Sequence, residues 1–115
     1  MKKDEFLNKL RQTPEHIEFS DVMTVIGDHY KYTPTAFRNG TAHNEAGTNE
    51  GSCKIFAFAQ LNNLPEDLTL ACFGQYYRED VLKNPEGDDH GNIRNFMKSG
   101  WTGVEFDQPP LTPKP

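Results

Sequence analysis

The segment from Cys53 to Asn62 constrains the fold most, because it is apolar on nearly every face. Its apolar side chains are Ile55, Phe56, Ala57, Phe58, Ala59 and Leu61. Such a run fits either a buried helix or a buried strand, since periodicity alone does not separate the two. The alanines, together with the polar residues Lys54 and Gln60 near its ends, favour a helix. We therefore predict a central helix that the other elements enclose.

Length and composition indicate one soluble domain. A chain of 115 residues with 35% hydrophobic and 25% charged residues can close a single core without disulfides. Seventeen acidic and twelve basic side chains give a formal net charge of -5, which argues against nucleic acid and anionic membranes as partners. The sequence shows no signal peptide and no membrane-spanning run, so we expect a cytoplasmic monomer. Cys53 and Cys72 are expected to be free thiols.

Hydrophobic periodicity and capping residues predict the remaining helices. They cover Lys2–Gln12, a segment capped by Ser20 and closed by Thr33-Pro34, a long helix over Pro65–Lys83, and a last helix over Asn92–Lys98 capped by Asp89. Gly74 lies inside the long helix, where glycine lowers helix stability. Trp101–Phe106 fits a short extended segment.

The predicted fold class is mostly α: a compact bundle of about five helices with a long glycine- and asparagine-rich loop. Residues 1–106 are expected to form one helical domain. Residues 107–115, which are rich in proline, are expected to form a mobile tail.

The segment from Thr35 to Ser52 is predicted to be an ordered loop, because glycines and asparagines are interleaved along it. It leads into a helix start, where unpaired backbone N–H groups and the helix dipole can hold an anion. The candidate binding residues here are Asn39, Asn44, Asn49, Ser52 and Lys54. The alternative is simple capping, in which Asn49 or Ser52 satisfies the helix terminus and Lys54 is solvated. The segment lacks the Gly-Lys-Ser/Thr of a nucleotide-binding P-loop.

Cys53 is the candidate nucleophile, because a thiol in the first turn of a helix can have a lowered pKa. A nucleophile needs a base, and the candidates are His43 in the loop and His90, which follows Asp88 and Asp89. The alternative is a buried cysteine that only packs, since no local signature of a cysteine enzyme surrounds it.

Metal and cofactor binding are not indicated. His16, His29, His43 and His90 lie on four different segments without the short paired spacing of metal ligands. The acidic stretch Glu86–Asn92 does not have the spacing of a calcium-binding EF-hand loop. We therefore predict no metal site and no cofactor.

Several long strings in the chain resemble the HopJ family. They are Ala36–Gly40, Asn44, Gly47–Ala59, Cys72–Arg78, Asp89–Met97 and Gly100–Val104. The similarity spans nearly the whole chain. The family takes its name from a protein assigned to the type III secretion effectors of plant-pathogenic bacteria. The resemblance therefore implies a bacterial protein and adds export by a type III system as an alternative location, but it carries no catalytic residue set.

Three functional hypotheses follow. The first is an interaction module without enzymatic activity that uses Phe37–Lys54 with Tyr76, Tyr77 and Trp101 to bind a protein partner. The second is a small hydrolase or transferase with Cys53 as nucleophile and His90 or His43 as base. The third is a binder of a small anionic ligand at the helix start.

Overall fold

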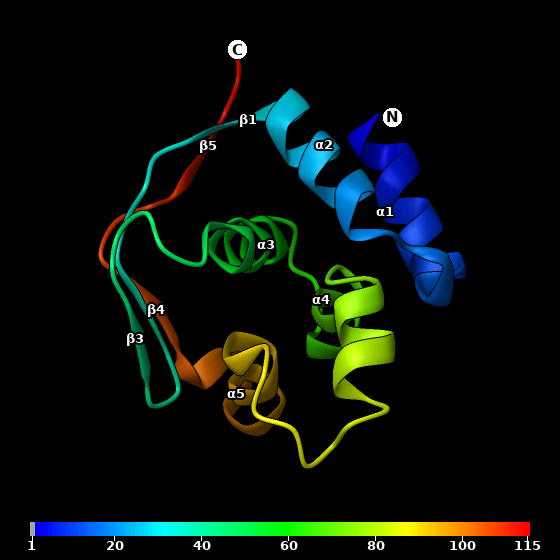
Figure 1. Cartoon of the computed structure of the whole chain (residues 1–115). Coiled ribbons are helices and arrows are strands. Elements are labelled where there is room, and N and C mark those ends of the chain that lie inside the picture. The colour runs from blue at the N-terminus through cyan, green and yellow to red at the C-terminus, as the bar shows by residue number, and fades with distance from the viewer. Residues whose placement is uncertain (1) are drawn as a thin grey trace.

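Helix α3 (Glu50–Leu61) lies at the centre of the computed structural model, which describes residues 2–115 (Figure 1). Ile55, Phe56 and Phe58 on this helix are fully buried. The aromatic neighbours of Phe56 are Phe37, Phe73, Phe96 and Trp101. These residues come from widely separated segments, so the chain folds around α3. The predicted central helix is confirmed.

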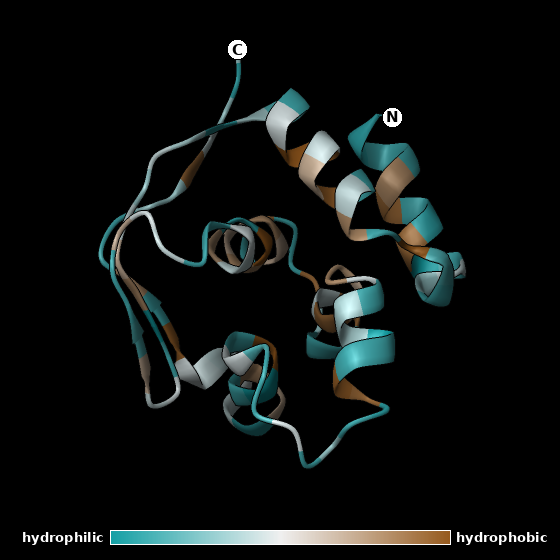
Figure 2. Ribbon diagram, in the orientation of Figure 1, coloured by the Kyte–Doolittle hydropathy of each residue, from teal (hydrophilic) through white to brown (hydrophobic). Residues whose placement is uncertain are grey.

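Two N-terminal helices cover one side of α3. They are α1 (Lys3–Gln12) and α2 (Phe19–His29), joined by the short helix η1 (Pro14–His16). Each of these helices carries apolar segments, brown in Figure 2, and its buried residues are apolar: Phe6, Leu7 and Leu10 on α1, and Val22, Val25 and Ile26 on α2. The two predicted helices are confirmed, with corrections at both ends of α2. The helix begins at Phe19, so Ser20 does not cap it, and it ends at His29, before the predicted stop at Thr33-Pro34, because Tyr30–Tyr32 form a strand.

The prediction of one long helix over residues 65–83 is wrong, because the helix is interrupted at Gly74. Helix α4 (Glu66–Ala71) ends before it, and a π-helical segment η2 (Tyr76–Val81) follows it. Gly74 has a φ of 61°, and a Cβ there would lie 2.6 Å from the backbone nitrogen of Phe19. Close packing against the start of α2 therefore turns the chain at this glycine.

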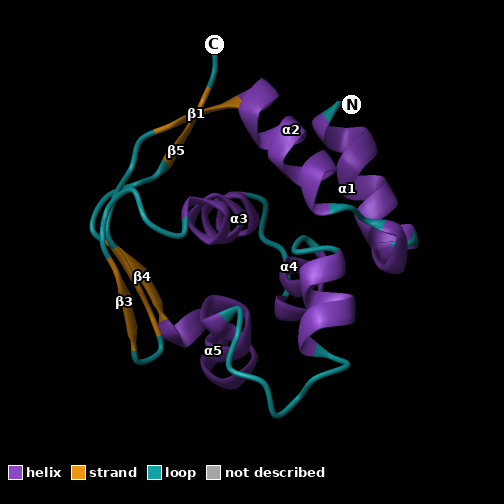
Figure 3. Cartoon of the chain, in the orientation of Figure 1, coloured by secondary structure: helices purple, strands orange, loops and turns teal. Residues whose placement is uncertain are grey.

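Much of the predicted loop is a β-hairpin, so the fold is not a purely helical bundle (Figure 3). Strand β2 (Phe37–Asn39) pairs with β3 (Ala42–Asn44) and, on its other side, with β4 (Val104–Phe106), both antiparallel. Gly40 supplies the positive φ of the hairpin turn and donates its N–H to the Gly103 carbonyl at 2.9 Å. The extended segment predicted near the C-terminus is partly confirmed, since η3 (Gly100–Gly103) precedes β4.

The prediction of a mobile tail over residues 107–115 missed a second small sheet. Strand β5 (Leu111–Pro113) pairs antiparallel with β1 (Tyr30–Tyr32). Two more backbone hydrogen bonds extend this contact, from the Thr33 N–H to the Pro110 carbonyl at 2.8 Å and from the Lys114 N–H to the His29 carbonyl at 3.0 Å. Leu111 is buried, so the tail gains apolar contact as well as backbone pairing.

The last helix, α5 (Gly91–Ser99), agrees with the prediction to within a residue at each end. Asp89 does not cap it; the residue at the cap position is His90, and the Asp89 carboxylate accepts a hydrogen bond from Arg94 instead. Gly100 ends the helix with a φ of 60°, as expected for a glycine after a helix.

Candidate functional site

A cleft of about 480 Å³ opens where strand β3 meets the starts of α2, α3 and α5. One wall is aromatic and contains Phe19, Phe73 and Tyr76. The polar side chains that line it are Asn44, Asn49, Ser52, His90 and Asn92. A few polar groups against an apolar wall are typical of sites that orient a small ligand.

The N-termini of α3 and α5 both open into this cleft. Each helix follows a residue in the left-handed region, Asn49 with a φ of 50° and His90 with a φ of 52°. No side chain of residues 2–115 caps either helix. Residues from both helix starts line the cleft, and the first N–H groups of a helix have no partner within their own helix. The positive ends of both helix dipoles lie at this cleft.

The predicted capping of α3 by Asn49 or Ser52 is wrong. The Asn49 side chain instead donates Nδ2–H to Asn44 Oδ1 at 2.7 Å. Gly51 follows at the start of the helix, where an added Cβ would lie 2.9 Å from the Phe19 ring. A glycine at this position thus lets the aromatic wall close against the helix start.

A network of buried amide side chains holds the polar side of the cleft. Asn92 donates Nδ2–H to Asn44 Oδ1 at 3.0 Å, and Asn44 donates Nδ2–H back to Asn92 Oδ1 at 3.3 Å. Asn39 donates to the Asn92 carbonyl at 2.8 Å and to Asn92 Oδ1 at 3.0 Å. All three residues are buried. The network connects the β-hairpin to the first turn of α5.

His90 is held by neighbours from two elements. Its Nε2 lies 2.9 Å from Asp80 Oδ2 on η2, and its ring centroid lies 5.3 Å from that of Tyr76. Asp89 Oδ2 is further away, at 3.8 Å. Arg94 donates to Asp89 Oδ1 at 2.6 Å, and this hydrogen bond lowers the pKa of the Asp89 carboxyl.

Asp80, Asp89 and His90 are the residues that could most readily hold a metal ion, since one ligand atom from each lies within 4.8 Å of the others. Their atoms already have partners, however. His90 Nε2 is within hydrogen-bond distance of Asp80, and Asp89 is paired with Arg94. The geometry is explained by hydrogen bonds within the chain.

The structure does not support an activated thiol at Cys53. The residue is 1% exposed and does not line the cleft. Burial, followed by the negative charge of Glu50, raises the pKa of the thiol to about 11, although a hydrogen bond with Tyr32 acts in the opposite direction. Burial and a nearby carboxylate thus oppose the lowering of the pKa that the first-turn position could bring, which favours the alternative of a buried cysteine that only packs.

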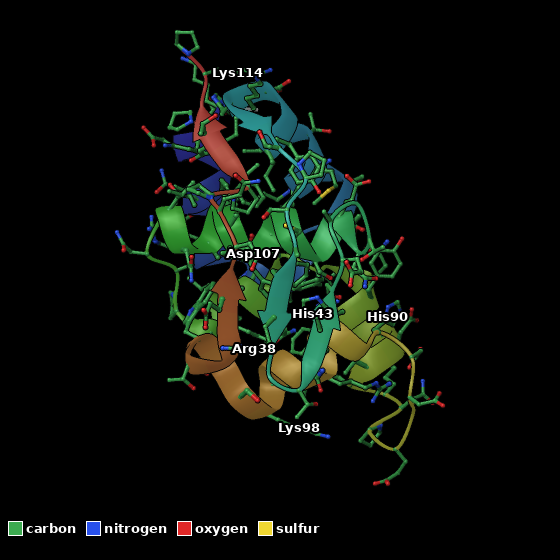
Figure 4. The ribbon with its side chains drawn as sticks, turned by 90° about the vertical axis from the view of Figure 1, so that its left-hand side faces the viewer. Arg38, His43, His90, Lys98, Asp107 and Lys114 are labelled. Atoms are coloured by element: carbon green, nitrogen blue, oxygen red, sulfur yellow. The ribbon has the colours of Figure 1, made fainter. Side chains whose placement is uncertain are left out.

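The two candidate bases are far from equivalent. His90 lines the cleft, whereas His43 is exposed on strand β3, 3.4 Å from Glu45. Figure 4 shows His43 on the hairpin and His90 at the side of the molecule. Cys53 has Tyr32 as its side-chain partner rather than an imidazole. The predicted Cys–His pair is therefore not assembled.

The other predicted site residues divide into two groups. Asn44, Asn49, Ser52 and Tyr76 line the cleft with His90, and Asn39 supports it through Asn92. Lys54, Tyr77 and Trp101 lie elsewhere: Lys54 Nζ is 4.7 Å from the centroid of the Tyr32 ring, Asp67 is a charged neighbour of Tyr77, and Trp101 packs on Phe96 and donates Nε1–H to the Leu64 carbonyl.

Sequence reasoning missed Phe19, Phe73, Asp80 and Asn92 as parts of the site. The Asn92 side chain had a usable signal, because an asparagine in the first turn of a helix often makes a specific hydrogen bond. Phe19 and Phe73 had none, because they are indistinguishable from core aromatics until the fold is known.

Fold and site define a small α-helical protein with two minor antiparallel sheets and an open cleft at two helix N-termini. None of the helices within residues 2–115 has the length and apolar character to span a bilayer. The chain belongs to the HopJ type III effector protein family, whose model matches residues 3–111.

Among solved structures, the chain is similar to one described as the crystal structure of the unknown function protein VPA0580. The two share 55% identity with a TM-score of 0.98, over 99% of this chain and 95% of that chain. A search of curated proteins gave no match.

Proposed function

We propose that this protein is a binding module whose cleft holds a small ligand by an acidic group, a carboxylate or a phosphate. The observation that carries the proposal is the convergence of the uncapped N-termini of α3 and α5 on one cleft. Backbone N–H groups at helix starts are strong donors to anionic oxygens, and the two dipoles act together.

The remaining walls of the cleft suit the rest of such a ligand. Phe19 and Tyr76 pack edge to face with their ring centroids 5.0 Å apart, and both line the cleft. They offer an apolar surface beside the donors. The asparagine network keeps the donors in place before a ligand arrives, which lowers the entropic cost of binding.

Binding without chemistry agrees better with the structure than a cysteine-dependent reaction does. Cys53 is buried with a raised pKa and lies outside the cleft. A thiol that stays protonated at neutral pH is a poor nucleophile.

A thermal-shift screen with phosphorylated and carboxylated metabolites tests the proposal. We expect a subset of these acids to raise the melting temperature in a concentration-dependent way, since a ligand that binds only the folded state stabilises it. Uncharged analogues of the same size should have no effect. The absence of any shift across the panel at millimolar concentrations would contradict the proposal.

A variant pair locates the site. Ser52→Glu places a carboxylate at the start of α3, where it competes with the ligand but does not destabilise the helix. The matched control is Ser20→Glu, at an exposed position in the first turn of α2 that does not line the cleft. We expect the first variant to lose the thermal shift and the second to keep it.

A further inference from the structure

Asp80 and His90 form a polar pair at the edge of the cleft. Asp80 belongs to the π-helical segment η2, and π-helical turns occur often at functional sites. An ionised carboxylate can only accept a hydrogen bond, so the 2.9 Å contact requires the proton on His90 Nε2. In the neutral ring, Nδ1 is then an acceptor.

The other groups around His90 do not compete for this role. Asp89 Oδ2 is 3.8 Å from the same nitrogen, and Arg94 holds the Asp89 carboxylate at 2.6 Å. Tyr76 packs against the imidazole ring with an interplanar angle of 40°. Asp80 is therefore the carboxylate within hydrogen-bond distance, and Tyr76 limits the tilt of the ring.

We infer that His90 places a hydrogen-bond acceptor in the cleft beside the donors of the helix starts, with Asp80 as its positioning residue. This inference rests on the proposed function and narrows its ligand class. The preferred ligand carries an O–H donor on or next to its acidic group, as hydrogen phosphate and 2-hydroxy carboxylates do. An oxyanion with acceptors alone would place an oxygen lone pair against Nδ1, which costs binding energy.

Phosphate and sulfate are the decisive probes. At about pH 8 both are mainly dianions of similar shape, but hydrogen phosphate retains one O–H. We expect phosphate to bind at least about tenfold more tightly than sulfate in calorimetric or NMR titrations. Glycolate against acetate gives the same comparison for carboxylates, and the stronger of the two preferences tells which acid the cleft suits.

Three variants test the residues. Asp80→Ala removes the partner of Nε2, and His90→Gly removes the ring at a position whose positive φ glycine adopts without strain. We expect both to bring phosphate and sulfate to equal affinity. Asp88→Ala, in the same exposed loop, is the control and should keep the wild-type preference.

The protonation of the two His90 ring nitrogens tests the same inference without a ligand. In ¹⁵N spectra of histidine-labelled protein, the neutral ring should carry its proton on Nε2 and show an unprotonated Nδ1. A proton on Nδ1 would overturn the inference, as would equal binding of phosphate and sulfate by the wild type. If none of the four probes binds, the proposed function itself fails, whereas binding of both members of each pair without preference leaves that function intact and removes only this inference.

Discussion

Asn44 and Asn92 exchange side-chain hydrogen bonds in both directions, at 3.0 and 3.3 Å, across 48 positions of sequence. Asn44 ends strand β3 and Asn92 lies in the first turn of α5. Both are buried and both line the cleft. The pair thus fixes the distance between the hairpin and the helix start, and the cleft depends on it.

The hydrogen-bonded pair of Asn44 and Asn92 should contribute measurably to the free energy of unfolding. Asn92→Ala removes the side-chain oxygen that accepts from Asn39 and Asn44 and the amide that donates to Asn44 Oδ1, while the Asn92 backbone carbonyl still accepts from Asn39. We expect it to lower the free energy of unfolding by about 1–3 kcal/mol. Asn44→Ala should cost a similar amount. Urea unfolding of the single and double variants checks this, with an expected coupling of about 1–2 kcal/mol. Additive costs would show that the two side chains do not interact.

The Cys53 thiol should label slowly. Because its pKa is raised to about 11 and it is buried, the folded protein presents almost no thiolate at neutral pH. Burial raises the pKa of Cys72 to about 12. We expect iodoacetamide to label both cysteines far more slowly than in the urea-unfolded chain, as measured by mass spectrometry. Rapid labelling of Cys53 alone would restore the nucleophile hypothesis.

The same raised pKa makes stability depend on alkaline pH. A group whose pKa is higher in the folded state stabilises the fold fully below its ordinary pKa and loses that contribution as the pH rises through the folded value. For Cys53 the window runs from 9.0 to about 11. We expect the wild type to lose about 1–2 kcal/mol more across this window than Cys53→Ala, measured by urea unfolding at each pH. Parallel pH profiles would contradict the raised pKa.

Gly74 and Gly27 should respond oppositely to alanine. Gly74→Ala forces a side chain into a positive φ and against the Phe19 backbone, so we expect a loss of about 2–4 kcal/mol. Gly27 lies inside α2 with nothing within 4 Å of an added Cβ. Gly27→Ala should therefore stabilise by about 0.5–1 kcal/mol. Melting temperatures of the two variants provide the test, and a tolerated Gly74→Ala would refute the break between α4 and η2.

The C-terminal strand should be part of the cooperative fold. Leu111 is buried, so Leu111→Ala is expected to cost about 2–3 kcal/mol, whereas Thr112→Ala, at an exposed position of the same strand, should cost little. Amide exchange gives an independent measurement, since the Lys114 N–H donates to the His29 carbonyl. Exchange of that amide at the rate of an unfolded peptide would mean that the strand is not formed.

Helices with a clear apolar pattern could be predicted from the sequence. Those over α1, α2, α3 and α5 agree with the structure, because each buries side chains at helical spacing or on all sides. The prediction of one long helix over residues 65–83 was wrong, because the close approach of the backbone at Gly74 to that of Phe19 overrides the local helix propensity. Strand β4 lies within the predicted extended segment, but the other three-residue strands were missed because they are too short to show alternation and their pairing is non-local.

The candidate site was predictable only where it depends on local sequence. Glycines and asparagines before α3 marked a helix start with special backbone geometry, and Asn44, Asn49 and Ser52 do line the cleft. The sequence could not show that the N-terminus of α5 lies at the same cleft as that of α3, because this depends on how α5 packs against the hairpin. The burial of Cys53, which argues against the nucleophile hypothesis, could not be predicted from its spacing along the chain.

The most direct test of the central claim is a ¹H–¹⁵N NMR titration of the protein with inorganic phosphate. We expect saturable shifts that are largest for the backbone amides at both helix starts, Gly51 and Ser52 on α3 together with Gly91 and Asn92 on α5. Shifts confined to one of the two helices, or spread over surface lysines such as Lys98 and Lys114, would contradict the claim.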